Sequence, residues 1–93
     1  FLDSVCHPDE LALGPFTPIE AAKIWTAKEA VVKTLGTGFF QGGVDFPDVQ
    51  VRPEDHVELH RNARMAAPRA RFELYVSEID GAIMTMALRY DDR

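Results

Sequence analysis

The sequence predicts an α+β domain in which one long helix packs on an antiparallel sheet of three or four strands. Residues 18–35 carry apolar side chains at helical spacing and contain no interior helix breaker. After residue 43, several runs alternate apolar with polar residues, which is the pattern of strands with one buried face. Helical and strand segments are therefore separated along the chain, which is typical of an α+β fold.

The predicted helix has a start signal and a stop signal at its two ends. Residues 17–20, TPIE, fit a capping box, in which the threonine oxygen accepts from the third helical amide and the glutamate reaches back to the cap amide. Pro18 falls at the first helical position, where its missing N–H costs nothing. Gly36 follows the last apolar residue and supplies the left-handed conformation that ends many helices. Upstream, residues 1–14 predict a short turn or helix.

Most of the circumference of this helix is apolar, which indicates that other elements cover it. A core stripe and two residues that widen it recur at helical spacing: Ile24, Ala27, Val31 and Leu35, with Trp25 and Val32. We expect Trp25 to pack in the core and not to contact a ligand, because aromatic residues at this spacing usually face other elements.

Strand character fills the second half of the chain. Short runs lie at residues 48–52 and around residues 57–59, a third alternates from residue 71 to 76, and residues 82–90, AIMTMALRY, give a last apolar strand. Asp80-Gly81 separates the last two strands and predicts a hairpin, because both residue types tolerate positive φ.

Composition excludes several functional classes. Ninety-three residues make one domain, and a hydrophobic content of 46% argues against disorder. The net charge of −5 disfavours nucleic acid as a partner, and no apolar run reaches the roughly 18–20 residues of a membrane span. The single cysteine, Cys6, can form no internal disulfide, and the histidines are too dispersed to predict a ligand set. We therefore expect a cytoplasmic protein without a membrane or nucleic-acid partner.

Three charged residues, Lys28, Glu29 and Lys33, lie inside the otherwise apolar helix. Glu29 and Lys33 are neighbours at i, i+4, so the trio could be an ordinary solvated face that contributes only a few tenths of a kcal/mol. Alternatively, two lysines beside one carboxylate could hold phosphate groups while the carboxylate binds a divalent cation. The glycines that follow, Gly36 and Gly38, would let the backbone approach such a ligand closely.

The stretch WTAKEAVVK, residues 25–33, strongly resembles the W-x-x-K-E-A-x-x-K signature of the 4′-phosphopantetheinyl transferase superfamily. The following LGTGF, residues 35–39, resembles the holo-acyl-carrier-protein synthase branch. Weaker similarity includes FLDSVCHPDELA upstream and GGVDFPDVQV downstream, so the motifs cover about residues 1–52. Beyond that point the similarity rests on the strand pattern alone.

The resemblance implies a transferase that moves the phosphopantetheine arm of coenzyme A onto a serine of an acyl or peptidyl carrier protein, with Mg2+. It implies that Glu29 is a magnesium ligand and that Lys28 and Lys33 lie at the phosphates of coenzyme A. Lys33 would also lie near the reacting β-phosphate, and either Glu29 or a metal-bound water would take the serine proton. Gly36 and Gly38 would shape the wall of the coenzyme A site.

The resemblance is incomplete, because the family carries a G-x-D motif well before this helix and its aspartate is a second magnesium ligand. Asp3 lacks the required glycine, and the G-x-D of residues 43–45 follows the helix, where we expect Asp45 to be a turn or strand-edge residue. We therefore expect residues 1–93 to form one subdomain without the family's first strand. The missing carboxylate could come from a segment of a longer enzyme, which we favour, or from a second chain, or be lost in a non-catalytic relative.

An alternative function follows from this gap: a non-catalytic or partner-dependent half-domain that binds coenzyme A or a carrier protein. We expect either a homo-oligomer or association with the missing N-terminal segment. Four arginines between residues 61 and 71 could meet an acidic carrier protein or simply solvate a loop, and we favour the loop.

Overall fold

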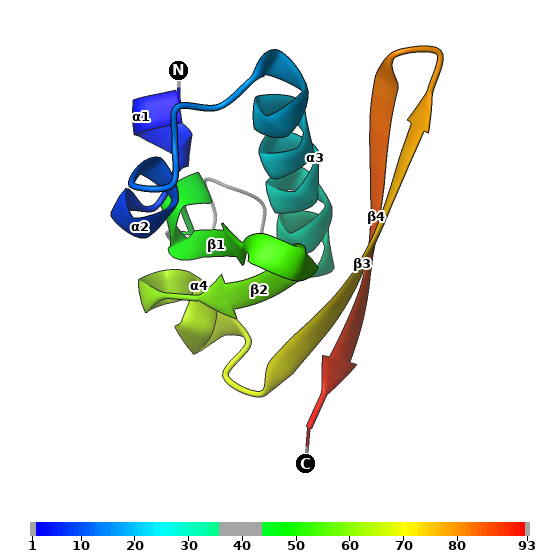
Figure 1. The fold of residues 1–93 in the computed structure, drawn as a ribbon. Helices are drawn as coiled ribbons and strands as arrows, with labels where there is room; N and C mark the ends of the chain where they lie inside the picture. The colour runs from blue at the N-terminus through cyan, green and yellow to red at the C-terminus, as the bar shows by residue number, and fades with distance from the viewer. Residues whose placement is uncertain (1, 36–43, 93) are drawn as a thin grey trace.

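The computed structural model describes residues 2–35 and 44–92 and shows an α+β fold (Figure 1). The elements in chain order are α1 (Leu2–Val5), α2 (Pro8–Leu11), α3 (Pro18–Leu35), the 3-10 turn η1 (Phe46–Asp48), β1 (Val49–Arg52), the 3-10 turn η2 (Pro53–Asp55), β2 (His56–Leu59), α4 (Arg61–Ala66), β3 (Ala70–Ile79) and β4 (Ala82–Asp91). Helix α3 lies between the part of the chain that contains α1, α2, β1 and β2 and the long hairpin of β3 and β4 (Figure 1).

The range of α3 is the range that the sequence predicts, and its capping box is formed. The Glu20 amide donates to Thr17 Oγ1 at 3.2 Å, and the Thr17 amide donates to Glu20 Oε1 at 3.0 Å. These two bonds satisfy backbone donors that no helical carbonyl can reach at a helix N-terminus. The capping box fixes the residue at which α3 begins. The direction of each later apolar or charged side chain around the helix axis then follows from its position in the sequence.

The predicted single sheet is not found in the described residues, whose four strands form two separate two-stranded antiparallel sheets. In one sheet β1 pairs with β2, with Val49 opposite Leu59, and in the other β3 pairs with β4. Helix α4 intervenes between β2 and β3, and the hairpin leaves the first sheet to run along α3 (Figure 1). Alternating residues identify strands and their buried faces, but they do not say which strands exchange hydrogen bonds.

The core lies between the C-terminal half of α3 and the strands and helix that follow it. Its buried members are Val31, Val32, Leu35, Val44, Val49, Leu59, Ala63 and Ala67. Trp25 packs against Phe46 with ring centroids 4.5 Å apart, as expected for a packing residue. The apolar stripe of α3 is thus covered from two sides, which explains why it extends around most of the helix.

The β3–β4 hairpin has one face on α3 and one face exposed. Asp80 and Gly81 at its tip have φ of 51° and 81°, so the predicted turn residues both adopt the left-handed conformation that a tight hairpin requires. Large apolar side chains are exposed on the outer face: Tyr75, Ile79, Met84, Met86, Leu88 and Tyr90. Alternation along both strands therefore sets an inner face against α3 and an outer face toward solvent.

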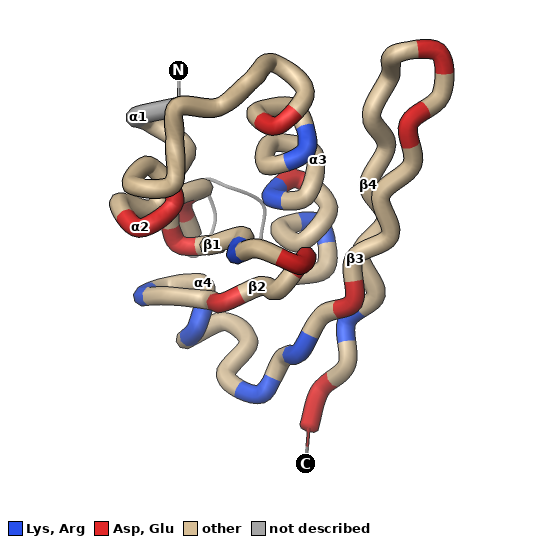
Figure 2. The backbone as a smooth tube through the Cα atoms, viewed as in Figure 1, with Lys and Arg blue, Asp and Glu red and all other residues tan. Residues whose placement is uncertain are grey.

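Basic residues are grouped on α4 and at the beginning of β3, whereas the hairpin tip is acidic (Figure 2). Several of the arginines contact neighbouring groups of the chain. Arg64 donates to the carbonyl oxygens of Leu59 and Pro68, and Arg71 lies 4.9 Å from the centre of the Tyr90 ring. Within the described part of the chain, no helix has the length and apolar character needed to cross a membrane.

Candidate functional site

The charged residues of α3 lie on different sides of the helix. Successive helical residues are rotated by about 100°, and residues four apart nearly coincide in direction. Glu29 and Lys33 therefore share a side, and both line a groove between α3 and β4. Lys28 faces another side, toward α2 and β1.

The groove between α3 and β4 has a volume of about 500 Å³. Its helical wall includes Glu29, which is half-buried, and Lys33, which is exposed, and its strand wall includes Ile83 and Thr85. No hydrogen bond or ion pair joins the side chain of Glu29 or Lys33 to another described residue. A carboxylate and an ammonium are thus available together at one concave surface, so the groove can receive a ligand that carries both a cation and anionic groups.

Two polar contacts hold β4 on α3 along this groove. Thr26 Oγ1 and Thr85 Oγ1 are 2.7 Å apart, and the Arg89 guanidinium donates to the Thr34 carbonyl oxygen at 2.8 Å. The second contact satisfies one of the carbonyls that a helix C-terminus leaves without a partner. Glu29 and Lys33 lie between these two contacts in the sequence of α3, so both ends of the helical wall are attached to the strand.

Lys28 is fully buried, and all N–H donors of its ammonium are hydrogen-bonded inside the protein. Its side chain is 0% exposed and donates to Glu10 Oε1 at 2.6 Å, to the Phe46 carbonyl at 3.0 Å and to the Val49 carbonyl. An ammonium has three N–H donors, and these contacts employ all of them. Burial lowers the pKa of Lys28, and the hydrogen bond and charge of Glu10 oppose that change.

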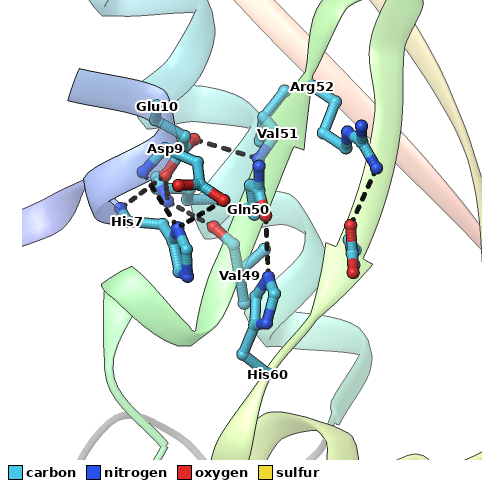
Figure 3. Close-up of polar contacts among 10 residues, drawn as sticks. His7, Asp9, Glu10, Val49, Gln50, Val51, Arg52 and His60 are labelled. Atoms are coloured by element: carbon cyan, nitrogen blue, oxygen red, sulfur yellow. Dashed lines mark hydrogen bonds and ion pairs between the residues drawn. The ribbon is translucent and has the colours of Figure 1, made fainter. Parts of the chain in front are cut away.

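Glu10 is the partner that makes this burial tolerable. It is 1% exposed, and besides Lys28 it accepts from the His7 amide at 2.7 Å and from the Val51 amide at 2.9 Å (Figure 3). The His7 ring stacks on the His60 ring with centroids 4.3 Å apart. His60 Nε2 in turn lies 2.7 Å from Gln50 Oε1 (Figure 3). One polar network therefore fastens α2 to β1, to the end of β2 and, through Lys28, to α3.

The structure brings together two of the predicted site residues and separates a third. Glu29 and Lys33 meet at the groove, whereas the ammonium of Lys28 is sealed on another side of α3 and does not face it. This geometry does not support the predicted contact of Lys28 with coenzyme A phosphates. The predicted ligand-binding glycines, Gly36 and Gly38, lie outside the described residues.

The geometry also bears on the second acidic group that the sequence lacks. Asp45 is exposed and caps the η1 turn, in keeping with the turn position expected for it. Among residues 2–35 and 44–92, no group of three or more His, Cys, Asp and Glu side chains is placed to hold a metal ion. The described residues thus offer one carboxylate, Glu29, to the groove.

Sequence reasoning missed Glu10. Its only signal was its place in FLDSVCHPDELA, the stretch that weakly resembles the lead into the family's helix. Nothing in that stretch shows that a glutamate beside Asp9 is buried, because the burial depends on Lys28, which lies 18 positions further along the chain.

The fold and the groove define an α+β domain that presents an available carboxylate and ammonium on one helix. The sequence matches the 4′-phosphopantetheinyl transferase superfamily over residues 1–87, and the chain belongs to that superfamily.

Two curated proteins are similar to parts of the chain. Holo-acyl-carrier-protein synthase of Verminephrobacter eiseniae (strain EF01-2) is 62% identical over 34 residues, which cover 37% of this chain and 25% of that protein. Fatty acid synthase subunit alpha of Saccharomyces cerevisiae (strain ATCC 204508 / S288c) is 34% identical over 77 residues, which cover 75% of this chain and 4% of that protein. The matched region is thus a quarter or less of each relative's length, and no solved structure matches the chain.

Proposed function

We propose that this chain takes part in the Mg2+-dependent transfer of the 4′-phosphopantetheine arm from coenzyme A to a serine of an acyl or peptidyl carrier protein. The observation that carries the proposal is the placement of Glu29 and Lys33. They lie one helical turn apart on a groove of about 500 Å³, and neither is paired with another described residue. Membership of the superfamily and the similarity to a holo-acyl-carrier-protein synthase support this assignment.

The chemistry of Glu29 fits a share in a magnesium site. Proteins commonly hold Mg2+ with one or two carboxylates, while substrate phosphates and waters complete the octahedron. Glu29 is half-buried and meets no cation of the described chain, so its carboxylate is available for this role. When bound, the cation would neutralise charge on the pyrophosphate of coenzyme A. The described residues supply one such carboxylate, and the proposal places the second on another segment or chain.

Lys33 would bind the phosphates and orient the pyrophosphate in the groove. Its side chain is exposed and flexible, and it can reach an anion whose position is fixed by other contacts. Positioning and charge stabilisation supply most of the catalysis in phosphoryl transfer, so a lysine at this place would act without forming a covalent bond. Glu29 is also a candidate for the base that takes the serine proton.

The direct test is incubation of the complete protein, together with any partner chain that supplies the second carboxylate, with coenzyme A, Mg2+ and a panel of apo carrier proteins, followed by mass spectrometry of the carriers. The proposal expects a carrier that gains the mass of one phosphopantetheine arm. Glu29→Gln should lose transfer while the fold remains, and Lys33→Ala should mainly raise KM for coenzyme A. Lys23→Ala is the matched control, because Lys23 is an exposed lysine of α3 that lines a different hollow. Equal losses in the two lysine variants would contradict the assignment of Lys33.

The second candidate function is a partner-dependent half-domain that binds coenzyme A or a carrier protein without catalysis. The single groove carboxylate among the described residues favours it. Calorimetric binding of coenzyme A without any mass gain in the carriers would support this function over the first. If the protein neither binds coenzyme A nor modifies a carrier, both candidate functions are contradicted.

A further inference from the structure

We propose that Glu10 and Lys28 are positioning residues that hold α3 at the rotation which turns Glu29 and Lys33 into the groove. The inference rests on the proposed function of the groove. It assigns Lys28 to the framework of the site, whereas the resemblance to the family places it on a phosphate.

The Glu10–Lys28 ion pair is buried and leaves Lys28 no N–H donor for a phosphate. The two side chains are 1% and 0% exposed, and their charged atoms are 2.6 Å apart. Lys28 also donates to carbonyl oxygens of η1 and β1, and Glu10 also accepts from the amide of His7, the N-cap residue of α2, and from an amide of β1. A phosphate could reach Lys28 only if the ammonium left these partners and exposed a buried carboxylate. Removing one partner of such a pair is strongly unfavourable, because the remaining charge stays in the core without compensation.

Helical geometry links the direction of Lys28 to the directions of Glu29 and Lys33. Lys28 and Glu29 are consecutive, so fixing the direction of one side chain fixes the other about 100° around the helix axis. Lys33 follows Glu29 by four residues and therefore moves with it. Any rotation of α3 that carried Glu29 away from the groove would also pull Lys28 away from Glu10.

Polar contacts hold α3 from two sides. Glu10 and the carbonyls of η1 and β1 hold Lys28, whereas Thr85 and Arg89 of β4 hold Thr26 and the Thr34 carbonyl. The hairpin contacts attach one side of the helix to β4, and the apolar core that contains Val31, Val32 and Leu35 packs its other side. The buried ion pair adds a directional polar contact beside Glu29, so the two sets of polar contacts together set the direction of the Glu29 carboxylate.

The experiment compares Lys28→Met, Glu10→Gln and the double variant with the wild type. A positioning role expects both single variants to lose kcat by a similar factor, roughly tenfold to a hundredfold, since small displacements of catalytic groups have effects of this size. The double variant should lose little more than either single variant, because both changes break the same contact. If Lys28 instead contacts phosphate, Lys28→Met should raise KM for coenzyme A, and Glu10→Gln should leave KM unchanged.

A second readout does not depend on activity. The proton NMR cross-peak between the Thr26 and Thr85 side chains, whose hydroxyl oxygens are 2.7 Å apart, reports how α3 faces β4. If Glu10 and Lys28 position α3, this cross-peak should weaken in both single variants. An unchanged cross-peak together with wild-type kcat in either variant would overturn the inference.

Two further comparisons separate a failure of folding and a failure of the proposed function from a failure of the positioning role. If Lys28→Met does not fold, Glu10→Asp retains the charge but shortens the side chain, and it should show a smaller loss of kcat and a partly weakened cross-peak. Wild-type behaviour of Glu10→Asp in both readouts would again overturn the inference. If the wild type itself transfers nothing to any carrier, the proposed function fails, and the cross-peak still decides whether Glu10 and Lys28 orient the helix.

Discussion

Thr26 and Thr85 share a hydrogen bond of 2.7 Å although 59 positions separate them in the sequence. Thr26 Oγ1 also lies 3.0 Å from the Ala22 carbonyl oxygen of its own helix, so this hydroxyl joins the backbone of α3 to the inner face of β4. Glu29 follows Thr26 by less than one turn, and the contact therefore fixes the width of the groove beside the carboxylate.

We predict that Thr26 and Thr85 are energetically coupled. Thr85→Val and Thr26→Val should each lower the free energy of unfolding by about 1 kcal/mol, the usual net value of one hydrogen bond. The double variant should cost about 1 kcal/mol less than the sum of the two, because the second change removes a group that has already lost its partner. Urea denaturation of the four proteins measures the coupling. Additive losses would contradict a shared hydrogen bond, and Ser77→Ala on the outer face of β3 serves as the neutral control.

The capping box of α3 should make stability depend on pH. Hydrogen bonds from the amide and hydroxyl of Thr17 hold the pKa of Glu20 below its ordinary value of 4.5. A carboxylate whose pKa is lower in the folded state stabilises the fold above the unfolded pKa and loses that contribution as pH falls through the folded pKa. The stability advantage of the wild type over Glu20→Gln should therefore be present at pH 7 and disappear in acid.

The control for this prediction removes the donor and keeps the carboxylate. In a Thr17→Ala background, the change from Glu20 to Gln should produce a smaller pH-dependent difference, because one of the bonds that lower the pKa is gone. Urea midpoints measured across the acidic range compare the two backgrounds. An identical pH dependence in both would show that the Thr17 hydroxyl does not lower the pKa of Glu20.

The buried ion pair predicts a marked asymmetry between single and double substitutions. Lys28→Met should cost about 3–5 kcal/mol, because it leaves the Glu10 carboxylate buried and uncompensated. Adding Glu10→Gln should recover part of that loss, since the neutral amide no longer carries an unpaired charge. Thermal or urea unfolding measures both. A double variant less stable than Lys28→Met alone would mean that Glu10 does not carry its charge against Lys28.

Val31 should be far more sensitive to truncation than the outer face of the hairpin. Val31 is 0% exposed in the core, so Val31→Ala should cost roughly 2 kcal/mol through lost burial and the cavity left behind. Met86 is 57% exposed, and Met86→Ala should change stability by about 0.5 kcal/mol or less. A large loss for Met86→Ala in urea unfolding would show that this outer face is covered in solution.

Much of the fold could be predicted because its signals are local. The TPIE cap, the apolar stripe of α3 and the Asp80-Gly81 turn each depend on neighbouring residues, and the structure contains all three. The pairing of the last two strands through the Asp80-Gly81 hairpin was predicted, but their separation from the first two strands was not, because it depends on where α4 carries the chain after β2. Local patterns do not encode that path.

The candidate site also has features that the sequence predicts and features that it does not. The i, i+4 spacing of Glu29 and Lys33 predicts their shared side, and the structure places both on the groove. The burial of Lys28 could not be predicted from that spacing, because it depends on a carboxylate 18 positions away and on two carbonyl oxygens from η1 and β1. A motif shows that a lysine is present, but it does not show whether that lysine contacts a ligand or a buried glutamate.

The different directions of Lys28 and Glu29 have a consequence for large-scale mutagenesis. A screen that scores only product would rank these two adjacent positions as equally intolerant of change. Measured together with the amount of protein that accumulates in the cell, they should separate: substitutions at Glu29 would yield abundant inactive protein, whereas substitutions at Lys28 would deplete the protein itself. Two consecutive letters of one motif would then belong to two different phenotypes.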